Sequence, residues 1–158
     1  MDLAKEQRAI QYLKAFEPET EPYYLCYSGG KDSDVIRILA SLAGVKHDIV
    51  NNHTTVDAPE TVRYIRTIPN VIINYPKKTM WQLIVEKRMP PTRLVRYCCA
   101  ELKEKGGKGR VKITGVRKAE SARRAANSDV VKIIGKPKMV EKLAMASGVE
   151  YAKNPMGG

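Results

Sequence analysis

Short apolar segments alternate with amphipathic segments along most of this chain. The first pair is YYLCY, residues 23–27, which is typical of a buried strand, and SDVIRILASLAG, residues 33–44, which has helical spacing and a glycine stop. Further strands are expected at 48–52, 70–75, 110–116 and 130–135, and further helices at 59–68, 79–88, 98–105 and 138–148. Strands that alternate with helices predict an α/β fold, with a doubly wound, mostly parallel sheet and helices on both faces.

The length and composition suit a single domain. The chain has 158 residues, of which 43% are hydrophobic, and this is enough for one core but too little for two ordinary domains. We therefore expect one domain over residues 1–158. In it, residues 1–22 are an N-terminal helix and connector, residues 23–124 are the core that carries the motifs, and residues 125–158 are a final strand and helix.

Charge and cysteine content narrow the class of partner and the compartment. The 28 Lys and Arg residues exceed the 17 Asp and Glu residues, which gives a formal net charge of +11. Such an excess favours a polyanionic partner, either a nucleotide or a nucleic acid. The N-terminal sequence has the pattern of neither a secretory signal nor a membrane span, and three cysteines make a poor disulfide framework. We therefore expect a cytoplasmic protein without a membrane partner.

The segment SGGKDS, residues 28–33, lies between the first expected strand and the helix that follows it. In open α/β sheets, ligands bind beyond the carboxyl ends of the strands, and this segment lies at such an end. Gly29 and Gly30 permit positive φ and a close approach of the backbone to an anion, while nearby amides and the helix N-terminus add partial positive charge. Lys31 adds a full positive charge. The segment therefore predicts a loop that binds a phosphate chain.

The other side chains of the segment fit the same interpretation. The hydroxyls of Ser28 and Ser33 are hydrogen-bond donors for phosphate oxygens. Because the Asp32 carboxylate repels bare phosphate, we expect it to cap the helix or to hold a Mg²⁺ ion. A Walker-type loop is excluded, since it needs Gly where Leu25 stands and Ser or Thr in place of Asp32, and the dinucleotide pattern G-x-G-x-x-G does not fit. A plain strand-to-helix turn with a capping side chain is the alternative without a ligand.

Four segments, in this order and spacing, resemble the motifs of known nucleotide-binding proteins. SGGKDS resembles the pyrophosphate-binding loop (PP-loop) of the adenine-nucleotide alpha-hydrolase superfamily, whose members cleave ATP between the α and β phosphates or bind an adenylyl product. Three later segments resemble motifs of the phosphoadenosine phosphosulfate reductase family: NHTTVDAPETVRYI, MPPTRLVRYCCAELKE and TGVRKAESARR. The resemblance runs from about Phe16 to Arg124 and is closest to the bacterial and phage branch. It implies a Rossmann-like fold that binds an adenine nucleotide.

The resemblance favours ATP over a sulfonucleotide as the ligand. The biosynthetic reductases typically lack the full SGGKDS spelling, which ATP-cleaving relatives share, and their catalytic cysteine near the C-terminus has no counterpart after Cys99 in this chain. We therefore expect ATP cleavage at the α phosphorus with release of pyrophosphate, and Lys31, Asp32 with Mg²⁺, and Arg117 as the charge-neutralising catalytic groups. One alternative is a reductase of phosphoadenosine phosphosulfate (PAPS) or adenosine phosphosulfate (APS), or a fragment of one. Another is a nucleic-acid-associated module of DNA sulfur modification or phage defence.

Further site residues are implied by the resemblance alone. In GVRKAESARR, we expect Arg117, Glu120 and Arg124 at the anion site, because arginine suits bidentate contacts to phosphate or sulfate and Glu120 orients an arginine or a metal. In the second motif, Asp57 and Glu60 are candidates for a ribose contact, which the resemblance favours, or for helix capping, which their position favours.

Cys98 and Cys99 form an adjacent pair of thiols. In iron–sulfur adenylylsulfate reductases a similar pair ligates a four-iron cluster together with a later C-x-x-C, and four thiolates are the usual requirement. We therefore expect an iron–sulfur cluster here only if further ligands come from elsewhere, with two ordinary thiols of a packed helix as the alternative. The final NPMGG resembles the start of the segment through which the family continues, which leaves open a natural short form or a truncated chain.

Residues 86–124 are rich in Lys and Arg. Five of them form either a track for nucleic acid or a solvated basic face: Lys103, Lys105, Lys108, Arg110 and Lys112. No aromatic residues interleave with them to support base stacking. Trp81 is expected in the core or in an interface, because tryptophan mostly contributes buried area. A homodimer is compatible with the resemblance.

Overall fold

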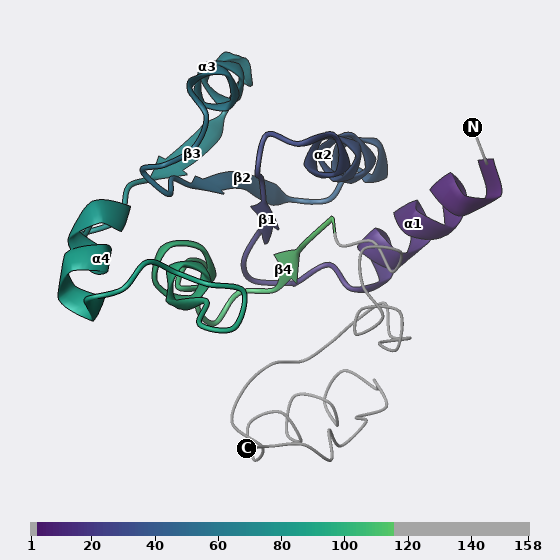
Figure 1. Ribbon diagram of the computed structural model, residues 1–158. Helices are drawn as coiled ribbons and strands as arrows, with labels where there is room; N and C mark the ends of the chain where they lie inside the picture. Colours follow the sequence, from purple (N-terminus) through teal and green to yellow (C-terminus); the bar gives the residue numbers. More distant parts are fainter. Residues whose placement is uncertain (1–2, 116–158) are drawn as a thin grey trace, which may run out of the picture. The chain divides into compact units, whose positions relative to one another are not determined.

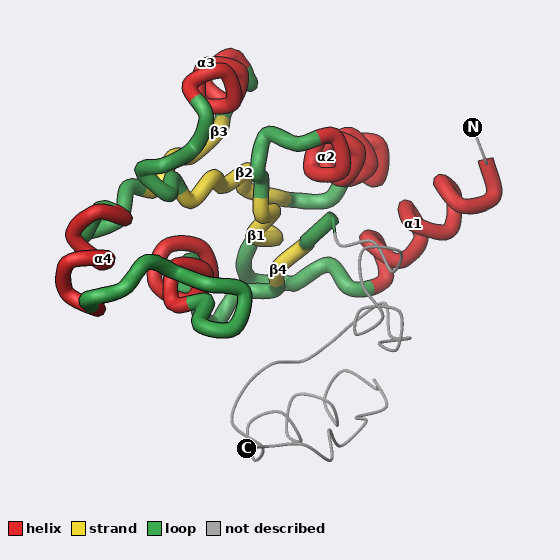
Figure 2. Tube along the Cα trace, in the orientation of Figure 1, coloured by secondary structure: helices red, strands yellow, loops and turns green. Residues whose placement is uncertain are grey.

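The computed structural model describes residues 3–115 (Figure 1). In chain order its elements are α1 (Leu3–Ala15), β1 (Tyr23–Cys26), α2 (Lys31–Ala43), β2 (His47–Asn52), α3 (Pro59–Thr67), β3 (Val71–Asn74), α4 (Met80–Lys87), the π-helix η1 (Cys99–Glu104) and β4 (Lys112–Ile113). Figure 2 shows how helices and strands alternate along the trace. The predicted order of elements is confirmed through β4. The strand expected at 130–135 and the helix expected at 138–148 lie outside the described residues.

The four strands form one parallel sheet in the order β3-β2-β1-β4. The chain moves outward from β1 through β2 to β3 and then returns to the other side of β1 with β4. Figure 1 shows α2 and α3 on one side of the sheet and η1 with α4 on the other. This arrangement confirms the expected α/β, doubly wound, Rossmann-like fold. The reversal of strand order lies between β1 and β4, and ligands of such sheets bind at the carboxyl ends of the strands at that point.

One face of the sheet carries the main apolar core. Residues two apart in a strand share a face, so Tyr23, Leu25 and Tyr27 project together, and all three are buried. They pack against Ala40 and Ala43 of α2, with Ile65 of α3 and residues of α1 at the margin. The small alanines let α2 lie close to the strands, which fixes the position of its N-terminal turn at the end of β1.

The opposite face of the sheet carries a polar cluster. The Tyr24 hydroxyl donates a hydrogen bond to Asn52 Oδ1 at 3.0 Å, and Asn52 Nδ2 donates to the carbonyl of Lys103 at 2.9 Å. The GGKG loop covers this cluster, because a Cβ on Gly106 would stand 2.2 Å from the Tyr24 hydroxyl and one on Gly107 would stand 2.6 Å from its ring. Glycine is therefore needed at both positions for close packing.

A second apolar cluster joins α4 to η1 through Met80, Leu83 and Leu102. Trp81 does not belong to it and is 68% exposed, so the core position considered for it is wrong for the described residues, while an interface position stays a prediction. The reason is helical spacing, because Met80 and Leu83 share the inward face of α4 and Trp81 projects about 100° away from Met80. No helix in residues 3–115 is both long and apolar enough to span a membrane.

The strand expected at 110–116 is observed only as Lys112–Ile113. Its early part is a turn, in which the Arg110 amide donates to the Gly107 carbonyl at 3.3 Å. The Arg110 side chain then reaches back across the sheet, donating to the Pro22 carbonyl and to Asp48 Oδ2, both at 2.6 Å. These contacts hold the start of β4 against β1 and β2.

Candidate nucleotide-binding site

The SGGKDS segment forms the connection between β1 and α2. Its backbone turns at Gly29, where φ is +74°, and then at Gly30, where φ is −93° and ψ is 158°. Positive φ was expected at both glycines; it is found at Gly29, and the expectation is wrong for Gly30, which has an extended backbone. A Cβ on Gly29 would stand 2.8 Å from Ile65 Cγ1 and 3.1 Å from Thr61 Cγ2. Gly29 is therefore required both by its backbone conformation and by contact with α3.

Gly30 serves as the N-cap of α2, and its carbonyl gathers the contacts that hold the turn. The amides of Ser33 and Asp34 donate to this carbonyl at 2.9 and 3.1 Å, and the Ser33 hydroxyl donates to it at 2.7 Å. The Ser28 hydroxyl in turn donates to the Ser33 hydroxyl at 3.3 Å. Ser33 is buried and stabilises the loop from the protein interior. Ser28 and Lys31 are both exposed. The cap expected from Asp32 is not found, because Asp32 lies inside the first turn of the helix.

A buried amide that sequence reasoning overlooked supports the start of the loop. Asn51, in β2, is 7% exposed, and its Nδ2 donates a hydrogen bond to the Tyr27 carbonyl at 2.8 Å. The Tyr27 amide donates to the Val50 carbonyl at 2.8 Å, so both backbone groups of this residue are held from β2. The only signal in the sequence was a polar residue directly after the apolar pair Ile49 and Val50 of this strand.

The first turn of α2 is anchored by a second overlooked residue, Asp34. Its carboxylate accepts hydrogen bonds from the Tyr27 hydroxyl at 2.7 Å and the Tyr64 hydroxyl at 2.9 Å, and Arg37 Nε lies 3.5 Å away. Burial alone would raise the pKa of Asp34, but the two tyrosine hydrogen bonds and Arg37 together lower it below its ordinary value. Burial and the hydrogen bond to Asp34 raise the pKa of Tyr27. The cluster joins β1, α2 and α3 directly behind the loop.

The lowered pKa of Asp34 predicts a pH dependence of stability. A carboxyl with a folded-state pKa below its unfolded-state pKa contributes stability that is present above the unfolded pKa and is lost as pH falls through the folded pKa. We expect Asp34→Asn to lower the free energy of unfolding at neutral pH by about 1.5–3 kcal/mol. We also expect the difference from wild type to shrink in acid. Urea unfolding of wild type and Asp34→Asn, measured from neutral pH into acid, gives the loss of stability and its change with pH. Glu19→Gln, at an exposed acid, is the control. A stability difference between wild type and Asp34→Asn that is the same at all pH values would contradict the assignment.

The end of β4 reaches the same turn. Gly115 lies so close to the start of α2 that a Cβ on it would stand 2.9 Å from the Asp32 carbonyl oxygen. The first residues of the TGVRKAESARR motif therefore meet the SGGKDS loop, at the reversal of strand order between β1 and β4. Arg117, Glu120 and Arg124, which the resemblance assigns to the anion site, lie outside the described residues and stay predictions.

The second motif forms the loop after β2. The Asp57 carboxylate accepts a hydrogen bond from the Thr54 amide at 2.7 Å, and the N-cap of α3 is Ala58, without a side-chain cap. The capping role considered for Asp57 and Glu60 is therefore not observed. Asp57 closes its own loop, and Glu60 lies exposed in the first turn of α3. A ribose contact by either residue stays a prediction.

Metal ligands were expected at Asp32 and at the adjacent cysteines. Residues 3–115 contain no group of three or more His, Cys, Asp or Glu side chains that could hold a metal ion. The whole chain has three cysteines, and Cys26 lies in β1, so its own thiolates do not make up the four that a four-iron cluster requires. The chain's own thiolates therefore do not complete a four-iron cluster, and a cluster with ligands from elsewhere stays a prediction. Asp32 suits Mg²⁺ better, since that ion is commonly held by one or two carboxylates together with substrate phosphates and water.

Several basic residues considered for a nucleic-acid track have structural partners. Arg110 binds Asp48 and lies 5.5 Å from the centroid of the Tyr24 ring. Lys105, the C-cap of η1, pairs with Glu101, and Lys112 donates to the Glu104 carbonyl at 3.3 Å. Three of the five basic residues therefore have structural contacts that explain their presence without a nucleic acid. A nucleic-acid partner, like the homodimer and the cytoplasmic location, stays a prediction.

Comparison with protein families agrees with this geometry. The family model described as the phosphoadenosine phosphosulfate reductase domain matches residues 22–142, which is more than half of the chain. The match begins just before β1 and includes the SGGKDS loop, the second motif, the adjacent cysteines and the TGVRKAESARR segment. Comparison with curated proteins and with solved structures gives no significant match. The chain belongs to the phosphoadenosine phosphosulfate reductase domain family.

Proposed function

We propose that this chain binds an adenine nucleotide with its phosphates on the SGGKDS loop. The observation that carries the proposal is the turn itself, in which Gly29 adopts a φ of +74° between a buried strand and a helix N-terminus. The amides of Lys31 and Asp32 open the helix, where backbone N–H groups lack intrahelical acceptors and bind anions readily. Exposed Ser28 and Lys31 lie on the same turn. Family membership supports a nucleotide as the anion.

The loop is held in place by the protein itself. Asn51 donates a hydrogen bond to the Tyr27 carbonyl, which directly precedes the loop, and Ser33 donates to the Gly30 carbonyl. Asp34 joins the first turn of α2 to Tyr27 and Tyr64. Because these contacts are made within the chain, little conformational entropy is lost when a phosphate binds. The loop therefore has the rigidity that a phosphate site needs.

Of the two nucleotide classes, ATP is the better candidate. The full SGGKDS spelling resembles that of ATP-cleaving relatives, whereas the biosynthetic reductases typically lack it. The proposed reaction is attack at the α phosphorus of ATP with departure of pyrophosphate. Lys31, the loop amides and Arg117 would stabilise the charge that develops on the leaving group. Asp32 would hold Mg²⁺, which supplies further charge neutralisation when bound.

Calorimetric titration tests the nucleotide class. We expect Mg²⁺ with ATP to bind wild type more tightly than PAPS does, and we expect Lys31→Ala to weaken ATP binding at least about tenfold, since it removes a charge-assisted contact to phosphate. Lys46→Ala is the matched control, because Lys46 is exposed and precedes β2 at the opposite edge of the sheet. Tighter binding of PAPS would instead support the reductase interpretation. Equal ATP affinity in wild type and Lys31→Ala would remove the loop assignment.

A further inference from the structure

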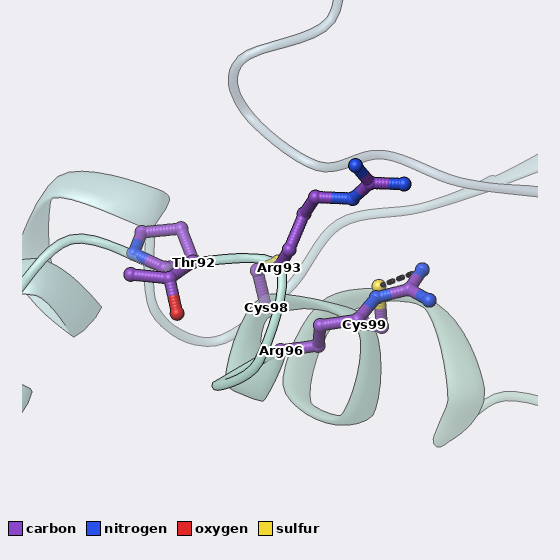
Figure 3. A pocket seen from close by; sticks show the side chains of 6 residues that line it. Thr92, Arg93, Arg96, Cys98 and Cys99 are labelled. Atoms are coloured by element: carbon purple, nitrogen blue, oxygen red, sulfur yellow. Dashed lines mark hydrogen bonds between the residues drawn. The ribbon is translucent and has the colours of Figure 1, made fainter.

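A cavity that no residue of the SGGKDS loop lines is found between the segment that follows α4 and the start of η1 (Figure 3). Its volume is about 490 Å³, within the range of small-molecule sites. The residues that line it are Pro91, Thr92, Arg93, Arg96, Cys98 and Cys99. The two charged side chains among them are both arginines, so the cavity favours an anion.

The two thiols of this cavity have different environments. The Arg96 guanidinium donates a hydrogen bond from Nη2 to Cys99 Sγ at 3.3 Å, the contact drawn in Figure 3. Cys98 instead packs against the apolar cluster of Met80, Leu83 and Leu102. Both thiols are half-buried and both lie within the electrostatic reach of Arg96, but in the described contacts only Cys99 accepts a hydrogen bond from its guanidinium. Cys99 is therefore the better placed of the two to react with an anionic compound.

The arginines are presented by a turn that needs no ligand. The Thr92 amide donates to the Val95 carbonyl at 3.1 Å, and the Val95 amide donates to the Thr92 hydroxyl at 3.0 Å. The Tyr97 hydroxyl donates to the Met89 carbonyl at 2.7 Å, which closes the segment at its base. Arg93 lies inside this turn and Arg96 directly after it. The positive wall of the cavity is thus built by the chain itself.

We propose that Cys99 is a thiol-modification site that exchanges with small anionic disulfides. The deprotonated sulfur of Cys99 attacks one sulfur of the disulfide, whose S–S bond breaks as the new Sγ–S bond forms. The other half leaves as a thiolate and takes a proton from water. The protein thiol is oxidised to a mixed disulfide, and the departing half of the reagent is reduced to a thiol. Arg93 and Arg96 bind the anionic groups of the reagent, and this proposal does not depend on nucleotide binding.

The rates of modification by two disulfides of opposite charge test the proposal. Glutathione disulfide is anionic and cystamine is cationic, and mass spectrometry of the full chain followed by peptide mapping gives the rate at each cysteine. The ratio of the two rates at Cys99 reports charge selection, because a change in the reactivity of the sulfur itself affects both reagents alike. The variants are Arg93→Gln with Arg96→Gln, and Arg66→Gln as a control that removes an exposed charge from α3.

We expect Cys99 to be modified by glutathione disulfide before Cys98 and Cys26. Cys26 should be slowest, because burial raises the pKa of its thiol. The ratio of anionic to cationic rates should fall about tenfold or more in the double arginine variant, since focused charge accelerates association by such factors, and should stay near wild type in Arg66→Gln. A ratio unchanged in the double variant, or modification of Cys98 first, would overturn the proposal. A circular dichroism spectrum equal to that of wild type shows that the double variant is folded, because loss of the arginines changes the cystamine rate as well.

Discussion

Gly29→Ala is expected to destabilise the protein more than any other single change in the loop. The residue has a φ of +74°, and a Cβ there would stand 2.8 Å from Cγ1 of the buried Ile65. A left-handed backbone costs about 1–2 kcal/mol for a residue with a Cβ, and overpacking a core costs roughly 1–3 kcal/mol more. We therefore expect the free energy of unfolding to fall by about 2–5 kcal/mol, as measured by urea denaturation.

Gly44→Ala separates the two causes of that loss. Gly44 ends α2 with a φ of +69°, which is close to that of Gly29, but a Cβ there would meet no atom within 4 Å. This variant should show only the backbone cost, about 1–2 kcal/mol. If Gly29→Ala lost no more stability than Gly44→Ala, the close packing of the loop against α3 would be wrong.

Gly30→Ala should have the opposite profile, with a normal fold and weak nucleotide binding. Its φ of −93° suits any residue, and the nearest atom to an added Cβ would be Ser28 Oγ at 3.5 Å. Stability should therefore stay near wild type or rise by about 0.4–1 kcal/mol, because alanine restricts the unfolded chain. The methyl group would lie next to the Ser28 hydroxyl, on the exposed part of the loop where we propose that phosphate binds. ATP affinity should fall about tenfold or more, which corresponds to about 1.4 kcal/mol.

The fold followed from patterns that depend on local sequence. Tyr23, Leu25 and Tyr27, which face the core, alternate with Tyr24, which belongs to the polar cluster, and with half-buried Cys26. The glycine that ends α2 lies where the helical spacing of apolar residues stops. Strand and helix order were therefore predictable, and the parallel sheet followed from their alternation. The length of β4 was not, because Arg110 is drawn into contacts with Asp48 and the Pro22 carbonyl, which are distant in sequence.

The loop was predictable as a motif, but its support was not. The glycines, Lys31 and the two serines were evident from their spelling between a strand and a helix. The roles of Asn51 and Asp34 depend on the positions of β2 and α3 beside the loop. Asn51 contacts Tyr27, which is 24 residues away in the sequence, and Asp34 contacts Tyr64, which is 30 residues away. Helix capping by Asp32 failed as a prediction because the extended Gly30 takes the N-cap position. Residues that hold a site from behind need tertiary contacts for their recognition.

The central claim is tested most directly by calorimetry, which gives the affinities of wild type and Gly30→Ala for Mg²⁺ with ATP. Thermal unfolding of the same samples checks that both proteins are folded. The comparison isolates the exposed surface of the loop, because the substitution leaves the backbone conformation and the core contacts unchanged. We predict that wild type binds ATP and that Gly30→Ala binds it at least about tenfold more weakly, although its stability is no lower than that of wild type. Equal affinity of the two folded proteins, or no binding by wild type, would contradict the assignment of phosphate binding to the SGGKDS loop.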